Sequence, residues 1–496
     1  MPLETLHLLP YGSQQKKSLN PEDARAQGVQ PYGPTVALAM ALNYIIGTGC
    51  FGLPYAFHTA GILLCSILLL IGLFGAIITM NYTLESLARA EGVFAATHGR
   101  GPLHRITYRK FDFTLVGEIF AGEFGKYTAQ LVITLYGIGS LWSYASIFAS
   151  SLASIIMTQI MEIPCDVYGP NPSNSCLDAY YTIMAFFAVI VISMVILNLS
   201  EQANVQKILC FYRVLAFSLM LATILVKLCA DGADVLWIRY KKIGGYNWQH
   251  FGKGFGPTLL ALNCHYNMPD VLQPLYPKMF ARDTAFSALL ISGTFYLLLG
   301  VLGALTFDQV NPLVSLMWSN YTGCGNGWAP CDPTHVSQLA LRMLGVLAKF
   351  IILLFPVVNL ALRMLGVLAK FIILLFPVVN VTSTYPMVGL TIGDNLLSCI
   401  PKSLAAPLGP KVARNVSRLL VSIPPLILAM VFKQLDFIFS IAGILGFLLG
   451  LTIPCWFQLI GSQYCQRVWG FTGASITPYN VKFISSIKFA QIYLDY

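Results

Sequence analysis

Charged residues are scarce in this sequence. Only 10% of its 496 residues are Asp, Glu, Lys or Arg, and 56% are hydrophobic, whereas roughly a quarter of an ordinary soluble domain is charged. This composition excludes a soluble globular protein. Apolar stretches of about 20 residues recur along nearly the whole chain, with loops too short to form a second core. We therefore predict a single all-α polytopic membrane domain.

Metal-site and nucleic-acid motifs are also lacking. None of the twelve cysteines falls in a CxxC or Cys/His metal spacing. The net charge of +9 is not accompanied by a basic stripe with interleaved aromatics. We therefore expect no metal site, no cofactor other than a coupling ion, and no nucleic-acid partner. The lipid bilayer is an expected partner, and the oligomeric state stays open.

Hydropathy predicts about ten membrane spans in two groups of five. The first group covers residues 35–57, 62–82, 127–156, 180–197 and 208–228. The second covers residues 256–274, 285–307, 339–358, 419–432 and 437–459. We divide the chain into an N-terminal tail, a transmembrane domain and a C-terminal tail, at residues 1–34, 35–460 and 461–496.

Lys and Arg are distributed unevenly among the loops. Residues 158–178 and 307–338 contain none, whereas residues 89–126 contain six. Because cytoplasmic loops carry the excess of basic residues, the N-terminus is predicted to be cytoplasmic. The basic run at 239–242, on the predicted outer face, departs from this pattern.

Two cysteine pairs fall in the loops predicted to be outside. Cys165 with Cys176 and Cys324 with Cys331 are candidates for disulfides, which persist on the oxidising side of a membrane. Asn320 begins an Asn-Tyr-Thr sequence on the same side and is a glycosylation candidate.

An exact tandem repeat interrupts the second group. Residues 339–359 recur without change as residues 360–380. One 21-residue copy is about 31 Å of helix, enough for one crossing. The basic loop at 390–418 stays inside only if the two copies cross once. We interpret the second copy as a duplication from gene assembly or as a very young insertion.

The first and sixth spans contain helix-breaking residues. Residues 43–54 read NYIIGTGCFGLP, and residues 263–270 read NCHYNMPD. Glycine weakens a helix, and proline cannot donate its backbone hydrogen bond. Interrupted helices at matching positions of two halves are typical of inverted-repeat transporters, whose substrates bind near the bilayer midplane. The alternative for each helix alone is a kinked, closely packed span.

The ends of such half-helices have chemical preferences. A half-helix N-terminus attracts a carboxylate, and freed carbonyls hold a cation or an ammonium group. His265 is ionisable within a span, which suggests substrate or proton binding, although a packing role stays open. His265 and Asp270 also match an H-x4-D acyltransferase pattern, but no other acyltransferase motif accompanies them.

The chain resembles the amino acid/auxin permease family, whose first span reads G-x-G-x-x-x-L-P. Gly47, Gly49, Leu53 and Pro54 match that motif. It is most similar to the branch named after transmembrane protein 104, through LNYIIGTGCFGLPYAFHTAG, LYGIGSLWSYA, CLDAY, CHYNMPDVLQPL and LFPVVNVTSTYPMVGLT. These motifs lie between about residues 33 and 460.

The resemblance implies a LeuT-like fold of five plus five inverted spans, usually followed by an eleventh, and no enzymatic chemistry. It implies secondary transport of amino acids driven by a proton or sodium gradient. The chain departs from the family pattern in lacking an eleventh span and in carrying the duplicated segment. The residues expected to bind the substrate are Gly47, Thr48, Gly49, Cys50, Asn263, His265 and Tyr266. Those expected at a coupling ion are Thr382 and Ser383, with His265 for a proton.

We therefore predict a multi-pass transporter of small neutral amino acids that works by alternating access. The rival hypothesis is a non-transporting amino-acid sensor that uses the same cavity. A channel is disfavoured because no ring of charged or hydroxyl side chains recurs in the spans. Residues 4–9, ETLHLL, fit an acidic dileucine sorting signal. The expected location is the plasma membrane or an endosomal, lysosomal or vacuolar membrane.

Overall fold

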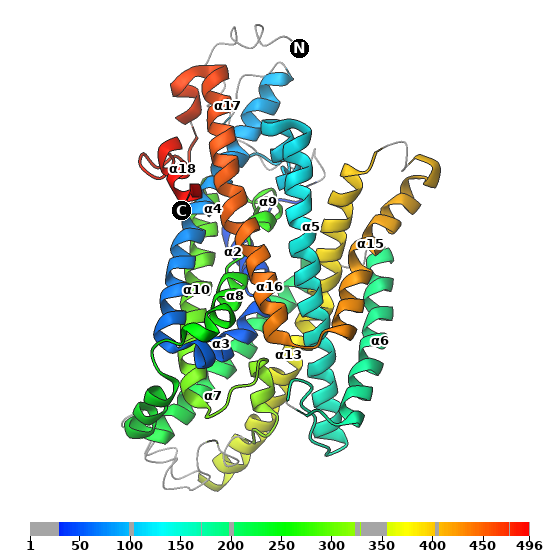
Figure 1. The fold of residues 1–496 in the computed structure, drawn as a ribbon, viewed down its shortest axis with the longest axis vertical. Coiled ribbons are helices and arrows are strands. Elements are labelled where there is room, and N and C mark those ends of the chain that lie inside the picture. The colour runs from blue at the N-terminus through cyan, green and yellow to red at the C-terminus, as the bar shows by residue number, and fades with distance from the viewer. Residues whose placement is uncertain are drawn as a thin grey trace.

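The computed structural model describes residues 29–98, 104–169, 171–197, 203–322, 328, 355–401, 406–475 and 477–495. Helices running roughly side by side form one elongated bundle (Figure 1). Apart from an isolated bridge between Tyr32 and Leu275, the described residues contain no strand pairing. The predicted all-α class is confirmed.

The helices of the first half come in the predicted order. They are α2 (Pro34–Ile45), η2 (Thr48–Gly52), α3 (Leu53–Ala60), α4 (Ile62–Thr97), α5 (Phe113–Ile155), α6 (Asn174–Leu197) and α7 (Ala203–Ile243). The second half comprises α8 (Phe251–Ala261), η5 (His265–Asn267), α9 (Met268–Leu272), α10 (Ala281–Thr306), α13 (Phe355–Cys399), α15 (Pro410–Val431), α16 (Leu435–Phe447), the π-helix η10 (Leu448–Thr452), α17 (Ile453–Ser475) and α18 (Ile487–Asp495).

Eight of the described helices are long and apolar enough to cross a membrane. The pair of half-helices around Gly47 adds a ninth crossing, bent by 51°. Helices α8 and α9, separated by η5, occupy the position of the predicted sixth span. The five-plus-five arrangement with broken first and sixth spans is therefore confirmed.

The tandem repeat contributes to one described crossing. This crossing runs from Leu365 to Leu397 within α13, so it includes most of the second copy and the residues that follow it. The first copy, where we placed the eighth span, lies outside the described residues except for its last five positions. The described crossing therefore begins later in the chain than hydropathy predicts.

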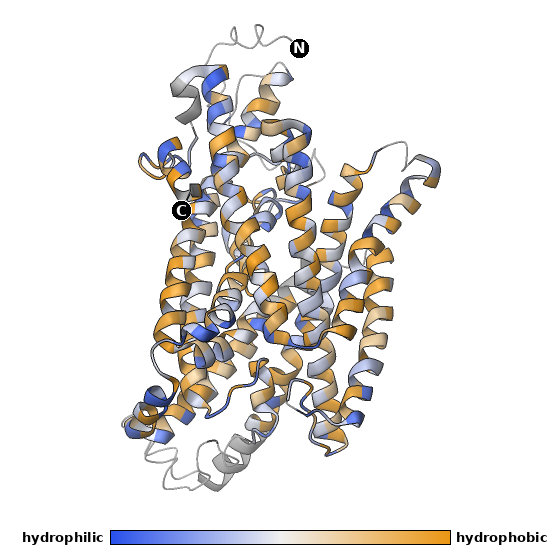
Figure 2. Ribbon diagram, viewed as in Figure 1, coloured by the Kyte–Doolittle hydropathy of each residue, from blue (hydrophilic) through white to orange (hydrophobic). Residues whose placement is uncertain are grey.

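Hydrophobic residues predominate along the middle of the helices, and hydrophilic residues are more frequent toward the two ends of the bundle (Figure 2). Helix α4 shows the pattern clearly, because its first half exposes large hydrophobic side chains: Leu63, Ile67, Leu70, Ile71 and Phe74. Its second half buries polar and charged side chains against the rest of the protein. An exposed apolar face of this kind matches the hydrocarbon of a bilayer.

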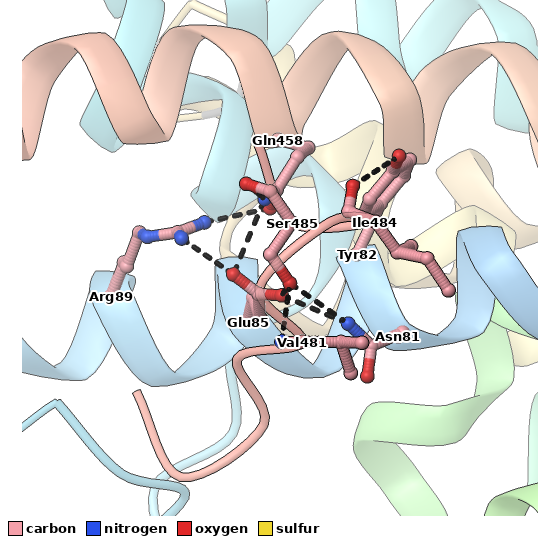
Figure 3. A network of polar contacts seen from close by, with 8 residues as sticks. All are labelled: Asn81, Tyr82, Glu85, Arg89, Gln458, Val481, Ile484 and Ser485. Atoms are coloured by element: carbon pink, nitrogen blue, oxygen red, sulfur yellow. Dashed lines mark hydrogen bonds and ion pairs between the residues drawn. The ribbon is translucent and has the colours of Figure 1, made fainter. Parts of the chain in front are cut away.

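The C-terminal residues pack against the bundle. Helix α17 continues the last span through Ser475, and residues 477–495 then return to α4. Figure 3 shows the polar contacts made there. Arg89 of α4 donates to Glu85 at 2.5 Å and to Gln458 of α17 at 2.6 Å. The Glu85 carboxylate also accepts from Asn81 at 2.8 Å and from Ser485.

This network is buried and joins three parts of the chain. Glu85 and Gln458 are fully buried, and Arg89 is 1% exposed. Gln458 also donates to the backbone oxygen of Ser485 at 3.1 Å. A buried charge is stable only when it is paired and hydrogen-bonded. Since Ser485 supplies two of the hydrogen bonds in this network, we infer that the network holds residues 477–485 against α4 and α17.

Candidate functional site

The first span is unwound at its glycines. Helix α2 ends at Ile45, Gly47 is extended with φ −98° and ψ −156°, and the short 3-10 helix η2 follows. Helix α3 then begins with Pro54 in its first turn, where a missing N–H causes no loss. The sequence therefore breaks the span where the motif predicts, between two half-helices.

Several carbonyls at this break have side-chain partners. The Tyr296 hydroxyl of α10 donates to the Ile45 oxygen at 2.8 Å. The Cys50 thiol donates to the Gly47 backbone oxygen at 3.1 Å. Backbone polar groups that leave a helix inside a membrane need such partners, so the surrounding spans hold the unwound segment in place.

The two broken spans touch through their backbones at Gly49. A Cβ atom built on Gly49 would lie 3.1 Å from the Ala261 N and Cα atoms at the end of α8. No side chain fits this approach without moving one of the two spans. Gly49 therefore fixes how closely the first and sixth spans meet.

The sixth span is interrupted between Ala261 and Met268. On one face of this interruption the Tyr266 ring packs edge-on against Tyr136 of α5, with centroids 5.6 Å apart. The Tyr266 phenol lies in the vicinity of those of Tyr144 and Tyr44. The Tyr144 hydroxyl lies 3.6 Å from the Cβ position of Gly47. Tyr144 therefore lies at the break of the first span, and Tyr136 lies at the break of the sixth.

His265 and Asn263 lie against other elements. His265 is 1% exposed, and its Nε2 atom lies 2.9 Å from the Thr79 hydroxyl and 3.0 Å from the Ala76 oxygen of α4. Asn263 is 6% exposed and lies beside Gly446 and Gly450 of the last span. The predicted substrate residues of the sixth span therefore divide, with Tyr266 against Tyr136 of α5 and the other two near α4 and η10. The Thr48 side chain lies outside the described residues.

Arg213 of α7 is a site residue that our sequence reasoning missed. It is 3% exposed and donates to the Asn43 oxygen at 2.7 Å and to the Asn43 side chain at 2.8 Å. It also donates to the Asn380 side chain of α13. Arg213 falls inside the predicted fifth span, so the same rule that singled out His265 as an ionisable group in a span would have found it.

The two predicted sodium ligands lie on α13, two and three residues after Asn380. The Thr382 hydroxyl donates to the Val378 oxygen at 2.8 Å, and the Ser383 hydroxyl donates to the Asn380 oxygen at 2.9 Å. Both hydroxyl hydrogens are therefore directed at their own helix. The cationic group in this region is the Arg213 guanidinium.

One end of the bundle, which we call the disulfide side, carries a disulfide between Cys165 and Cys176 with Cα atoms 5.3 Å apart. Asn320 lies exposed after η7 (Val314–Trp318). Cys324, Cys331 and the dileucine segment at 4–9 lie outside the described residues. Arg239, from the basic run that departs from the loop pattern, is paired with Asp231 at 2.6 Å and with Asp308 at 3.0 Å.

The disulfide side contains a cleft of about 730 Å³. Its lining includes Tyr55 of α3, Lys253 of α8 and Asp436 of α16. Lys253 and Asp436 form an ion pair at 2.9 Å across the cleft wall. This ion pair joins the sixth and tenth spans beside the cleft.

The opposite end, which we call the N-terminal side, is closed by contacts to α9. The Lys110 ammonium lies 2.5 Å from the Asp270 carboxylate. The Tyr32 hydroxyl donates to the Val271 oxygen at 2.8 Å, and Gln273 donates to the Tyr108 oxygen at 3.0 Å. The segment before α2 and the loop before α5 therefore both hold the second half of the sixth span.

His104, in that loop, gives a prediction about pH. It is buried against Trp469 with ring centroids 4.9 Å apart, and burial, with a smaller effect from Arg89, lowers its pKa to about 4. The unfolded group titrates near 6.5, so the unfolded state binds more protons between pH 6.5 and 4, and stability falls as pH falls through this range. We expect acidification to loosen the loop and change Trp469 fluorescence. His104→Gln should remove this pH-dependent component, and an unchanged titration in that variant would contradict it.

Comparisons with known proteins agree with this geometry. The structure of MhsT in complex with L-phenylalanine superposes with a TM-score of 0.52, covering 94% of this chain and 98% of that one at 12% identity. The transmembrane protein 104 homolog of Caenorhabditis elegans is 24% identical over 73% of this chain and 68% of its own length. The homolog of Drosophila melanogaster is 21% identical over 88% of this chain and 90% of its own length.

The bundle and its two broken spans define a multi-pass membrane protein of the LeuT fold. The sequence matches the family described as transmembrane amino acid transporter protein over residues 32–486. The chain belongs to this family, as the resemblance of its motifs predicts.

Proposed function

We propose that the chain is a secondary active transporter of small neutral amino acids that works by alternating access. The observation that carries this proposal is the contact between the unwound first span and the interrupted sixth span at Gly49 and Ala261. A substrate carboxylate would bind the backbone N–H groups of Gly47 to Cys50, at the start of the second half-helix. The substrate ammonium would bind carbonyls at the same break.

The preference for a neutral side chain rests on the tyrosines. Tyr44, Tyr136, Tyr144 and Tyr266 offer rings and hydroxyls, and Arg213 already binds Asn43 and Asn380. A charged substrate side chain in a buried site needs an opposite charge. The described residues near Gly47 and Tyr266 do not supply a carboxylate partner.

Alternating access follows from the two ends of the bundle. The N-terminal side, which we assign to the cytoplasm from its basic loops, is closed by the Lys110–Asp270 pair and Tyr32. The disulfide side contains the cleft beside Lys253 and Asp436. In our proposal, transport alternates between this arrangement and one in which the N-terminal side is open.

We propose that the coupling ion is a proton. The Arg213 guanidinium binds the end of α2 and the Asn380 side chain, and Asn380 lies two and three residues before the predicted sodium ligands Thr382 and Ser383. A second cation close to a fixed guanidinium would be repelled. Because arginine stays protonated in proteins, this charge persists throughout the transport cycle.

Uptake should therefore be independent of sodium. Arg213→Gln removes the fixed charge and at least one hydrogen bond to a buried acceptor, so we expect proton-driven uptake to fall at least about tenfold. Arg282→Gln, on a partly exposed side chain at the start of α10, is the control. Sodium-dependent uptake by the unaltered protein would contradict the proton assignment.

The test of function is uptake of a panel of labelled amino acids into proteoliposomes containing the purified full chain. Accumulation of at least one neutral amino acid under an imposed proton gradient is expected. Saturable binding without accumulation would overturn transport and favour an amino-acid sensor that uses the same cavity.

A further inference from the structure

A small polar cavity lies on the side of the sixth span that faces α4 and η10. Its lining includes Asn263, His265, Gly446 and Gly450. Three buried polar atoms have no hydrogen-bond partner among the described residues, namely His265 Nδ1, Asn263 Oδ1 and Asn263 Nδ2. Tyr136 approaches the same carboxamide without forming a hydrogen bond of ordinary geometry. Three unpaired polar atoms in a membrane domain cost free energy. Their arrangement therefore indicates that a bound species pairs with them.

The hydrogen bonds of His265 determine its neutral tautomer. A carbonyl oxygen only accepts, so the contact between Nε2 and the Ala76 oxygen at 3.0 Å places the ring hydrogen on Nε2. The Thr79 hydroxyl donates to the Gly75 oxygen at 3.0 Å and so accepts from Nε2. The Nδ1 lone pair is therefore the basic site, and it points into the cavity.

The glycines of the last span provide the space. A Cβ atom on Gly450 would lie 2.8 Å from Asn263 Oδ1 and 3.3 Å from His265 Nδ1, so both atoms face one point. Gly450 lies in the π-helix η10, a type of helix that often marks functional sites. Three polar atoms around one small space match the two to four partners that a buried water requires.

The surroundings of His265 carry no competing charge. The other residues that line the cavity are glycines, alanine, leucines and a phenylalanine. From α4, His265 meets only Thr79 and the Ala76 backbone. Within the described lining, His265 is therefore the one ionisable side chain.

We propose that Asn263, His265 and Gly450 form the binding site of the coupling proton, separate from the amino-acid site. A proton from water adds to Nδ1, and the new N–H donates to Asn263 Oδ1 directly or through a bound water. The imidazolium carries the added charge until the proton returns to water on the other side of the membrane. This inference rests on proton-driven transport as the proposed function.

The location of this site explains how proton and substrate binding are linked. His265 and Tyr266 are consecutive in η5, with the His265 ring against α4 and the Tyr266 ring against Tyr136 of α5. A change at His265 that shifts η5 also shifts Tyr266 beside Tyr136. By thermodynamic reciprocity, substrate binding must then change the proton affinity by the same factor.

The test combines two measurements on the full chain. Histidine labelled with ¹⁵N is titrated in lipid bicelles, and the His265 signals are assigned by their loss in His265→Gln. We expect a neutral Nε2–H tautomer whose Nδ1 takes a proton as pH falls. The second measurement is uptake into proteoliposomes of the amino acid that the panel shows to be accumulated most. His265→Gln and Gly450→Ala should each lower its proton-driven accumulation at least about tenfold. Both variants should still exchange labelled for unlabelled amino acid in a counterflow assay.

The control is Gly461→Ala in α17, where the atoms nearest to the new Cβ atom would belong to the Phe120 ring, at 3.2–3.4 Å. Its accumulation should match that of the unaltered protein. Full proton-driven accumulation by His265→Gln would overturn the site while leaving the proposed function intact. The proposed proton site would also be overturned by an Nδ1–H tautomer of His265, or by an Nδ1 atom that takes no proton between pH 8 and 5. This second test of the site holds even if the unaltered protein accumulates no amino acid.

Discussion

Gly49→Leu should abolish amino-acid uptake while the protein still inserts into the membrane. The new side chain would begin 3.1 Å from the Ala261 backbone, so the first and sixth spans must separate. A displacement of about 1 Å at a site that positions a ligand costs on the order of 100-fold in rate, and a leucine forces more than that. Initial uptake rates, normalised to the amount of protein in the liposomes, measure the effect.

Gly33→Leu is the matched control. Gly33 precedes α2 in an extended conformation, and a Cβ atom there would meet nothing within 4 Å. Uptake by this variant should stay within about twofold of normal. Gly49→Ala should give an intermediate loss, since only one methyl group enters the contact. Normal transport by Gly49→Leu would exclude the proposed substrate site.

Glu85→Ala should be the most destabilising single substitution that we propose. It would leave the Arg89 guanidinium buried without its carboxylate and would remove the acceptor for Asn81 and Ser485. Breaking a buried ion pair by deleting one partner costs about 3–5 kcal/mol. The measurement is thermal unfolding of the purified protein in detergent, followed by the fluorescence of its tryptophans.

Glu123→Ala, at an exposed position of α5, should leave the unfolding temperature unchanged. Combining Glu85→Gln with Arg89→Met removes both charges, so this double variant should be more stable than Glu85→Ala. Equal stability of Glu85→Ala and the unaltered protein would show that the buried network does not hold residues 477–485 against α4.

The breaks in the first and sixth spans were predictable because their causes are local. Gly47, Gly49 and Pro54 weaken a helix wherever they occur, and Pro269 does the same in the sixth span. The number and grouping of the spans follow equally from local hydropathy. These parts of the fold do not depend on knowing which helices become neighbours.

The contacts around the breaks were not predictable, because they join distant residues. Arg213 lies 170 residues from Asn43 and 167 from Asn380, and Ser485 lies 400 residues from Glu85. Hydropathy and motif spacing do not predict which side chains form contacts when the residues lie far apart in the sequence. For the same reason, the sequence placed His265 at the substrate, whereas packing turns it toward α4.

Two groups carried a signal that our sequence analysis did not use. An arginine inside a predicted span is as informative as a histidine there, and Arg213 was such a residue. Tyr136 and Tyr144 lie about two turns apart in the LYGIGSLWSYA motif and therefore share a face of α5. Reading that motif for its face would have placed both phenols on the side of α5 that meets the two broken spans, with Tyr144 beside Gly47 and Tyr136 beside Tyr266.

The central claim is that a proton gradient drives amino-acid accumulation by this chain. The most direct measurement is the steady-state ratio of labelled amino acid inside and outside proteoliposomes in sodium-free buffer, with and without an imposed pH gradient. Our account predicts accumulation above the external concentration that collapses when an ionophore dissipates the gradient. A ratio that never exceeds one in either gradient direction, with binding to the protein retained, would contradict it.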